Sequence, residues 1–175
     1  MDRKACVIRL PQRLSAVSPL ALAVVLMLSM LVLCGGCSLR SSSPGIDESG
    51  SASGQAISKT ALAQIGTPYK YGGTNPERGF DCSGLVCWSY GRHGLRTPRT
   101  ASEQNGMGKK IGRNALKVGD VVVFRTGSGM HTGIYTGNGR FVHSPGTGKR
   151  VRQDDINSKY WSKRFVAGRR HQGIY

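Results

Sequence analysis

Cys82 is the residue of this chain best placed to act as a nucleophile. It follows Asp81 in a glycine-rich bend and precedes the largely apolar run 85–90, a pattern that predicts a helix starting near Cys82. The start of a helix offers unpaired N–H groups and a positive dipole end, and both favour the thiolate, the form of cysteine that attacks carbonyl groups. Taken alone, a buried structural thiol is the commoner alternative for such a cysteine.

Two histidines further along the chain could complete a catalytic group. His131 opens the strand-like segment 131–135, and a neutral histidine can take a thiol proton and pass it to a leaving amine. His143 lies in the next strand-like segment, 141–144, where it could bond the far ring nitrogen of His131 and fix its tautomer. A lone strand histidine is more often a hydrogen-bonded polar residue with no catalytic part.

Whether the two histidines share a face depends on the loop between their strands. A two-residue loop would put His143 on the sheet face opposite His131. A three-residue loop, 137–139, would pair Gly133 with His143 and make the histidines diagonal neighbours, roughly 7–8 Å apart at Cα. We therefore predict the three-residue loop, with Gly139 at positive φ. A two-residue loop with no bulge elsewhere would contradict the role of His143.

The elements that position these residues are predicted from hydrophobic period and turn signals. Helical spacing marks 57–65, 82–94, 100–106 and 155–160, and Thr100 with Glu103 fits a capping box. Strand patterns mark 121–124, 132–135, 141–143, 148–152 and 164–169. Helices come first and antiparallel strands follow, which favours an α+β fold.

The first 55 residues read as export and tethering segments. Residues 1–36 have a basic start and an apolar run, 20–33, whose roughly 21 Å as a helix falls short of the about 30 Å bilayer core. The run ends in small residues before Cys37 and resembles the lipobox of bacterial lipoproteins, in which that cysteine is acylated. Plain secretion and an uncleaved anchor are the alternatives. Residues 37–55, rich in Ser and Gly, predict a flexible tether, and 56–175 a single folded domain.

The chain is strongly basic, with 25 Lys and Arg against 9 Asp and Glu and a formal net charge of +16. Such a charge suggests a polyanionic neighbour. No nucleic-acid-binding motif is present, so anionic lipids and wall polymers are the expected neighbours of an exported protein. Basic residues kept simply for solubility are the alternative.

Cys87, the other cysteine of the domain, is expected to pack in the core. It lies five positions after Cys82 on the same predicted helix but on another face, which disfavours a disulfide between them. The same spacing is poor ligand geometry for zinc.

Three motifs follow one another along the chain: Asp81-Cys82-Ser83-Gly84-Leu85-Val86, His131-Thr132-Gly133-Ile134-Tyr135 and Phe141-Val142-His143-Ser144. Together they resemble the NlpC family of papain-like cell-wall cysteine endopeptidases, over about residues 57–170. The resemblance implies a papain-like α+β fold, with a small antiparallel sheet packed against helices and the nucleophile at a helix N-terminus. It makes Cys82 the nucleophile, His131 the base and His143 the third polar member.

The same resemblance implies roles for three neighbours and a substrate. Tyr69 lies beside the nucleophile, where its hydroxyl helps bind an oxyanion, and Asp81 and Ser83 line substrate subsites. The substrate is the peptidoglycan stem peptide, cut between D-glutamate, through its γ-carboxyl, and the following diamino acid. No metal or organic cofactor is expected.

The resemblance also bears on location and partners. The family includes lipoproteins with a short tether, and Ser38 rather than Asp after the acylated cysteine favours the outer membrane, facing the periplasm. We therefore expect a lipid anchor in a membrane and no nucleic-acid partner, and leave a regulatory protein open. A non-catalytic envelope-binding lipoprotein and an acyltransferase on another amide or ester are the alternative functions.

Overall fold

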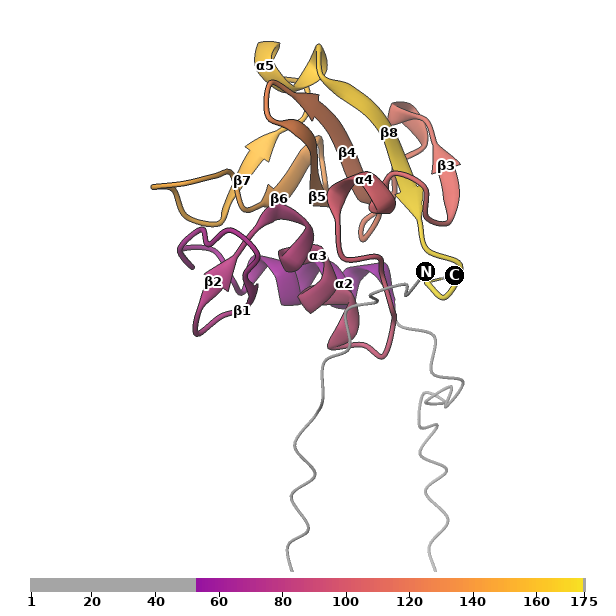
Figure 1. The fold of residues 1–175 in the computed structure, drawn as a ribbon. Helices are drawn as coiled ribbons and strands as arrows, with labels where there is room; N and C mark the ends of the chain where they lie inside the picture. Colours follow the sequence, from indigo (N-terminus) through magenta and orange to yellow (C-terminus); the bar gives the residue numbers. More distant parts are fainter. Residues whose placement is uncertain (1–52, 175) are drawn as a thin grey trace, which may run out of the picture. The chain divides into compact units, whose positions relative to one another are not determined.

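A six-stranded antiparallel sheet, in the order β3-β8-β4-β5-β6-β7, packs against a group of helices (Figure 1). The computed structural model describes residues 53–174. The signal segment, Cys37 and all but the last residues of the tether therefore lie outside the described residues. Helices α2, α3 and α4 contact β5, the strand that carries His131. The predicted α+β fold with an antiparallel sheet against helices is confirmed.

The helices are α2 (Gly54–Leu62), α3 (Cys82–Gly91), α4 (Ala101–Gln104) and α5 (Lys159–Ser162), with a 3-10 turn at Arg113–Ala115. The strands are β1 (Thr74–Asn75), β2 (Gly79–Phe80), β3 (Lys109–Ile111), β4 (Val121–Thr126), β5 (Gly129–Gly137), β6 (Arg140–His143), β7 (Arg152–Asp155) and β8 (Phe165–Arg170). The short pair β1-β2 forms a separate two-stranded sheet.

Side-chain caps fix where α2 and α4 begin. The Ser53 hydroxyl accepts from the N–H of Ala56 and caps α2, which begins inside the segment expected to be the tether. Its buried face carries Ile57 and Ala61, four residues apart, as helical spacing requires. The capping box predicted from Thr100 and Glu103 is present at the start of α4.

The central strand β4 is buried on both faces. Alternate residues of a strand point to opposite faces, and two core clusters use this alternation. Val121 and Val123 pack with the helices, whereas Val122 and Phe124 join an aromatic cluster on the other face. That second cluster comprises Val122, Phe124, Phe141, Ile156 and Trp161. His131 and His143 lie on the face of the second cluster, against Trp161.

The loop between β5 and β6 differs from the prediction. Gly137 pairs with Arg140, so the loop has only two residues, Asn138 and Gly139, with φ of +50° and +72°. The three-residue loop is therefore wrong, although the positive φ of Gly139 is confirmed. A bulge between Tyr135 and Gly137 inserts one extra residue and restores the register.

The bulge gives the same pairing of β5 with β6 that the three-residue loop would have given. Ile134 pairs with Val142, and one step further along the strands Gly133 lies opposite His143. A Cβ on Gly133 would come within 3.0 Å of the His143 Cβ, so the two residues meet closely. His131 and His143 consequently share a face of the sheet.

The C-terminal elements are also shifted from their predicted positions. The strand expected at 148–152 is β7, Arg152–Asp155, and the helix expected at 155–160 is the single turn α5. Strand β3 was not predicted, because its two exposed lysines hide the pattern and only Ile111 is buried.

Candidate active site

Cys82 is the first residue of α3, as predicted. Asp81 caps the helix, its Oδ1 accepting from the N–H of Gly84 at 2.6 Å. Gly84 has to be glycine, because a Cβ there would overlap the carbonyl oxygen of Gly73. The first turn of α3 is therefore pressed against the preceding loop, and that contact fixes where Cys82 stands.

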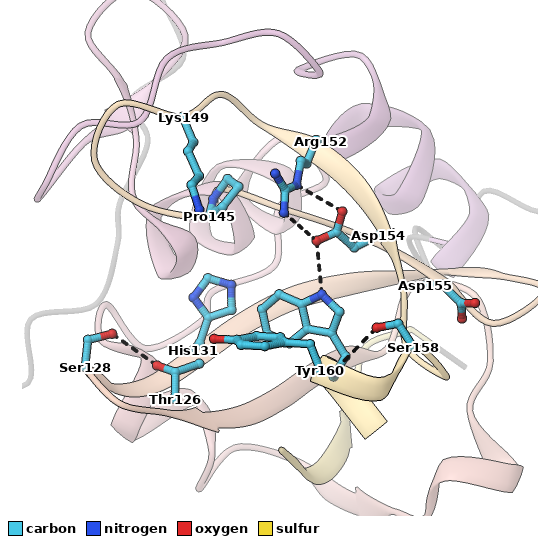
Figure 2. Close-up of a pocket in the computed structure, with 11 residues that line it drawn as sticks. Thr126, Ser128, His131, Pro145, Lys149, Arg152, Asp154, Asp155, Ser158 and Tyr160 are labelled. Carbon is cyan, nitrogen blue, oxygen red and sulfur yellow. Dashed lines mark hydrogen bonds and ion pairs between the residues drawn. The ribbon is translucent and has the colours of Figure 1, made fainter. Parts of the chain in front are cut away.

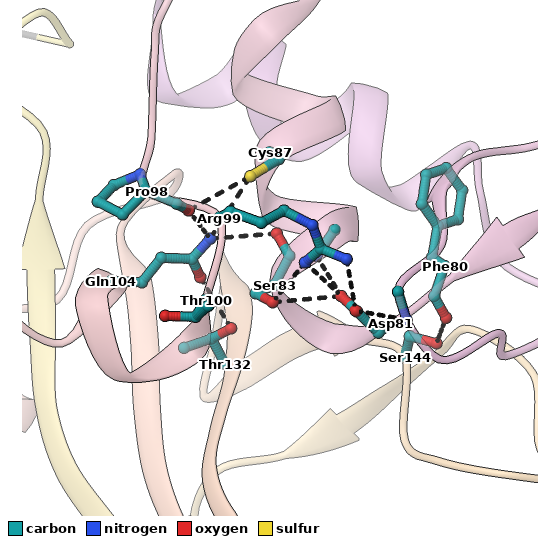
Figure 3. Close-up of polar contacts among 12 residues, drawn as sticks. Phe80, Asp81, Ser83, Cys87, Pro98, Arg99, Thr100, Gln104, Thr132 and Ser144 are labelled. Atoms are coloured by element: carbon teal, nitrogen blue, oxygen red, sulfur yellow. Dashed lines mark hydrogen bonds and ion pairs between the residues drawn. The ribbon is translucent and has the colours of Figure 1, made fainter. Parts of the chain in front are cut away.

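The Asp81 carboxylate is held from several sides (Figure 3). Arg99 donates to both of its oxygens, at 3.0 and 2.7 Å, and Ser83 Oγ donates at 3.2 Å. The N–H of Gly72 donates to Asp81 Oδ2 at 3.0 Å. Asp81 and Ser83 line the cavity that contains Cys82, as their predicted subsite role requires. Their mutual bonds also give them a part in holding the nucleophile.

Gln104 ties the nucleophile helix to the strand of the base (Figure 3). Its side chain is fully buried. Gln104 Nε2 donates to the carbonyl of Ser83 at 3.1 Å and to that of Pro98 at 2.9 Å. Its Oε1 accepts from the hydroxyl of Thr132 at 2.9 Å. One side chain thus joins the residue after Cys82 to the residue after His131, a role that was not predicted.

A chain of hydrogen bonds runs from His131 to an acidic residue. His131 Nε2 lies 2.8 Å from His143 Nδ1, and His143 Nε2 lies 3.0 Å from Asp154 Oδ2. His131 is 8% exposed and His143 fully buried. The predicted pairing of the two histidines is present, and Asp154 extends it by a member that was not predicted.

The direction of this chain follows from the carboxylate at its end. A carboxylate only accepts, so Nε2 of His143 carries the proton and its Nδ1 accepts. Nε2 of His131 must then be the donor to His143, which leaves Nδ1 of His131 unprotonated. The chain therefore holds His131 in the tautomer that can act as a base through Nδ1.

Asp154 is kept ionised by three donors (Figure 2). The hydrogen bond from His143, with those from Arg152 and Trp161, holds the pKa of the Asp154 carboxyl far below its usual range. Arg152 donates to both carboxylate oxygens, at 3.0 and 2.9 Å, and Trp161 Nε1 donates at 3.0 Å. The acceptor that fixes the tautomer therefore remains a carboxylate at any ordinary pH.

Burial makes both reactive groups neutral at rest. It lowers the pKa of His131 to about 3, helped by the nearby His143 and opposed by Asp154. It also lowers the pKa of His143, against the hydrogen bond that His143 donates to Asp154. Burial raises the pKa of the Cys82 thiol, although the N–H of Thr132 opposes this. Desolvation outweighs the hydrogen bonds from Thr132 and Ser83 that favour the thiolate, so the resting pair is thiol and imidazole.

Tyr69 lies on the rim of the same site. It lines the cavity with Cys82, and its backbone N–H donates to the carbonyl of Lys149 at 2.9 Å. Partial burial and the negative charge of Asp81 raise the pKa of the Tyr69 phenol. The hydroxyl is consequently a hydrogen-bond donor at neutral pH, as an oxyanion contact needs.

Two cavities meet at His131. The first, about 710 Å³, contains Cys82 and Tyr69, and the second, about 530 Å³, contains Trp161. Ser128, His131 and Pro145 line both, so the two form one groove past the base. Figure 2 shows the second cavity and the residues that line it, His131 among them.

In residues 53–174 no group of three or more His, Cys, Asp and Glu side chains is arranged to hold a metal ion. Within the same residues no helix is long and apolar enough to cross a membrane. Cys82 and Cys87 are not joined by a disulfide, and Cys87 is buried in the core as predicted.

A cysteine at a helix N-terminus, facing a cavity with a buried and oriented histidine, on helices packed against an antiparallel sheet, is the arrangement of papain-like thiol hydrolases. The model of the NlpC/P60 family matches residues 66–170. The chain belongs to the NlpC/P60 family, as its three motifs predicted.

Relatives of known name carry the same domain. The chain is 45% identical over 117 residues to the bifunctional muramidase/DL-endopeptidase CwlT of Bacillus subtilis, a match that covers 65% of this chain and 35% of that protein. It is 44% identical over 115 residues to the murein DD-endopeptidase MepH of Escherichia coli, covering 62% and 42%. The chain thus spans less than half the length of these two relatives.

A solved structure agrees with the sequence matches. The NlpC/p60 domain of the peptidoglycan hydrolase SagA superposes with a TM-score of 0.60 at 30% identity, over 68% of this chain and 99% of that one. The similarity therefore extends over almost the whole of an independent domain.

Proposed function

We propose that this protein is a cysteine endopeptidase that hydrolyses the stem peptide of bacterial peptidoglycan. The observation that carries the proposal is the hydrogen-bond chain from Asp154 through His143 to His131, which leaves Nδ1 of His131 as a base in the cavity of Cys82. The names of CwlT and MepH, both endopeptidases, supply the substrate class.

The mechanism is acyl transfer through Cys82. His131 Nδ1 takes the thiol proton as the sulfur attacks the scissile carbonyl, and the imidazolium is stabilised through His143 by the Asp154 carboxylate. Backbone N–H groups at the start of α3 and the Tyr69 hydroxyl donate to the oxyanion, each such donor being worth about 3–4 kcal/mol. His131 then protonates the leaving amine, and water attacks the thioester to release the acid and the free thiol.

The groove on both sides of the base favours an endopeptidase. A substrate residue typically follows the scissile bond as well as preceding it, and the cavities on either side of His131 offer space for both. Of the bonds cut by the relatives, we propose the one between D-glutamate and the diamino acid, which matches the DL-endopeptidase name of CwlT.

The proposal includes an envelope location. We propose that Cys37 is acylated after removal of residues 1–36 and that the lipid holds the domain on a membrane, facing the periplasm at the outer membrane. The basic composition, +16 over the whole chain, suits a neighbourhood of anionic lipids and wall polymers. Metabolic labelling of the full chain with palmitate, compared with Cys37→Ser, tests this part, because only an acylated Cys37 gives a label that the variant loses.

Digestion of purified peptidoglycan tests the activity. The chain from Ser38 onward is compared with Cys82→Ala and with Cys87→Ala, which removes the other thiol of the same helix, and released fragments are identified by mass. We expect the parent and Cys87→Ala to release fragments ending in D-glutamate and Cys82→Ala to release none. Turnover by Cys82→Ala would refute the nucleophile. Binding without release by the parent would favour a non-catalytic envelope protein, and transfer of the acyl group to an added amine in place of water an acyltransferase.

A further inference from the structure

The hydrogen bonds of Gln104 fix which way its amide points (Figure 3). Gln104 Nε2 donates to the carbonyl oxygens of Ser83 and Pro98, and a carbonyl oxygen can only accept. Its contact with Cys87 Sγ, at 3.8 Å, is longer. Both amide protons are therefore used, and the amide oxygen is the atom that faces Thr132 Oγ1 at 2.9 Å. Since an amide oxygen also only accepts, the Thr132 hydroxyl gives its one proton to Gln104.

Thr132 also contacts the nucleophile. It pairs with Val123 of β4, whose side chain packs with the helices, so the Thr132 side chain faces the helices too. The N–H and the hydroxyl of Thr132 both hydrogen-bond with Cys82, and both lower the pKa of its thiol. Thr132 is fully buried and lines neither cavity of the groove. It therefore meets the sulfur from the interior of the protein, where a substrate cannot displace it.

The hydroxyl has one proton and two acceptors once Cys82 is ionised. At rest Cys82 is a thiol that needs no donor, and the proton points to Gln104 Oε1. When His131 takes the thiol proton, the sulfur becomes an anion, and a hydrogen bond to an anion is roughly twice as strong as one between neutral groups. Rotation about the Cβ–Oγ1 bond then turns the Thr132 proton to the sulfur without moving a heavy atom. This bond forms as the charge develops, so it lowers the barrier rather than stabilising the resting enzyme.

We propose that Thr132 is a further catalytic residue, whose hydroxyl donates to Gln104 in the resting enzyme and to the Cys82 sulfur as the thiolate forms. Gln104 is a positioning residue, because it acts on the sulfur only through the Thr132 proton. We call these two residues the hydroxyl switch. Their effects are opposite: the Thr132 hydroxyl favours the thiolate, and the Gln104 oxygen competes with the thiolate for the same proton. The switch rests on the proposed function only for its effect on hydrolysis, since it acts on the thiol with or without a substrate.

Alkylation of Cys82 by iodoacetamide measures the thiolate without any substrate. The rate is followed from about pH 6 to about pH 10 in the chain from Ser38 onward, and fragment masses separate Cys82 from Cys87. Thr132→Val removes the hydroxyl with little change of shape. We expect its alkylation to be about 5-fold slower at pH 7, with a titration that moves to higher pH. Thr132→Ser restores the donor, and with it a rate within about 2-fold of the parental one.

Gln104→Met tests the other half of the switch. It replaces the amide by an apolar side chain of similar length, so the Thr132 proton loses its acceptor and is free for the sulfur at all times. We expect alkylation about 3-fold faster at pH 7 and a titration that moves to lower pH. In a Thr132→Val background the same Gln104→Met change is expected to leave the rate unaltered, because no hydroxyl proton remains to be released. Near-UV circular dichroism confirms that each variant is folded.

Thr136→Val is the matched control. Thr136 lies on the same strand and its hydroxyl accepts from Gln153 at 2.7 Å, so this variant also removes a hydroxyl paired with a glutamine. It is expected to keep the parental titration. All variants keep the same titratable and charged groups around the cavity of Cys82, namely Asp81, Arg99, His131 and Tyr69. A general loosening of the site would move Thr132→Val and Gln104→Met in the same direction. That outcome, or a Thr132→Val titration equal to that of Thr136→Val, overturns the switch.

Hydrolysis of a synthetic stem peptide separates the switch from the proposed function. We expect Thr132→Val to lower kcat about 5-fold with KM unchanged, because Thr132 lines neither cavity in which the substrate would lie. Opposite shifts of alkylation in Thr132→Val and Gln104→Met, with no cleavage by the parent, would refute the endopeptidase and keep the switch. Cleavage by the parent without these opposite shifts would refute the switch and keep the endopeptidase.

Discussion

Replacement of Asp154 by asparagine is expected to slow turnover without changing the tautomer of His131. Asp154 Oδ2 faces three N–H donors, His143 Nε2 and Trp161 Nε1 at 3.0 Å and a terminal nitrogen of Arg152 at 2.9 Å. An asparagine therefore places its oxygen there, because its amide nitrogen would meet all three donors head-on. Its nitrogen then faces Nε of Arg152, which loses one hydrogen bond. The tautomer survives and the negative charge is lost.

The size of the effect follows from the distance between the charges. The carboxylate is separated from the His131 ring by the 3.0 Å bond, the His143 ring and the 2.8 Å bond. A total of about 8 Å at an effective dielectric constant of about 20 gives about 2 kcal/mol for a carboxylate acting on an imidazolium. We expect Asp154→Asn to lower kcat about 30-fold. Asp154→Ala is expected to lower it further, because His143 is then free to adopt the other tautomer.

The assay is the pH dependence of kcat and kcat/KM on a synthetic stem peptide. Because the Asp154 charge raises the pKa of His131, its removal lowers that pKa further, and the acid limb of kcat/KM moves to lower pH. Asp155→Asn is the matched control, since Asp155 lines the same cavity without bonding His143. Near-UV circular dichroism confirms that each variant is folded. Turnover of Asp154→Asn equal to that of Asp155→Asn, or an acid limb that moves to higher pH, would refute the reasoning.

Three further predictions concern how the site is held. Gln104→Ala leaves the Thr132 hydroxyl and two buried carbonyls without their partner, and we expect chemical denaturation to show a loss of about 2–3 kcal/mol. Gly84→Ala drives a Cβ into the preceding loop, so titration with a thiol reagent is expected to show a changed Cys82 reactivity at pH 7. The same titration in a Cys87→Ala background removes any contribution of the other thiol to the signal. The free energy of unfolding should decrease as the pH is lowered, because the pKa values of His131 and His143 are lower in the folded than in the unfolded chain. Below pH of about 6.5 the unfolded chain therefore binds more protons, and urea titrations should show stability lost toward pH 3, by up to about 1.4 kcal/mol per pH unit for each histidine. An unchanged midpoint over that range would contradict the burial of neutral imidazoles.

The nucleophile and the two histidines could be predicted because thiol catalysis requires cysteine and histidine, two uncommon residue types, at particular positions of helices and strands. A thiol at a helix start and two histidines on adjacent strands are few enough to be found by type and spacing. Asp154 could not be found in this way. It lies in a polar segment, Arg152–Asp155, whose pattern does not mark it as part of a sheet, and only the pairing of β7 with β6 brings it to His143. Gln104 was not predicted for a related reason, since its three partners come from a helix, a strand and the loop before its own helix.

The hairpin shows a second limit. Three successive residues, Gly137, Asn138 and Gly139, all adopt positive φ, so the sequence permits either loop length. Which face a side chain takes depends on the total number of residues between the paired positions, and a bulge changes that number as effectively as a longer loop does. The prediction that the histidines meet was therefore correct although the turn was wrong. The residue types indicated that His131 and His143 should meet, and the bulge in β5 determines the register that brings them together.

Neutral reactive groups make the rate depend on the charges fixed around them. At rest the buried thiol and imidazole carry no charge, so the thiolate–imidazolium pair has to be created during the reaction in a poorly solvated site. Asp154 favours that pair permanently, because its carboxylate raises the pKa of His131 through the hydrogen bonds of His143. A substitution that removes this charge therefore acts on the chemical step, and a peptide that fits the groove equally well would be bound and cut slowly.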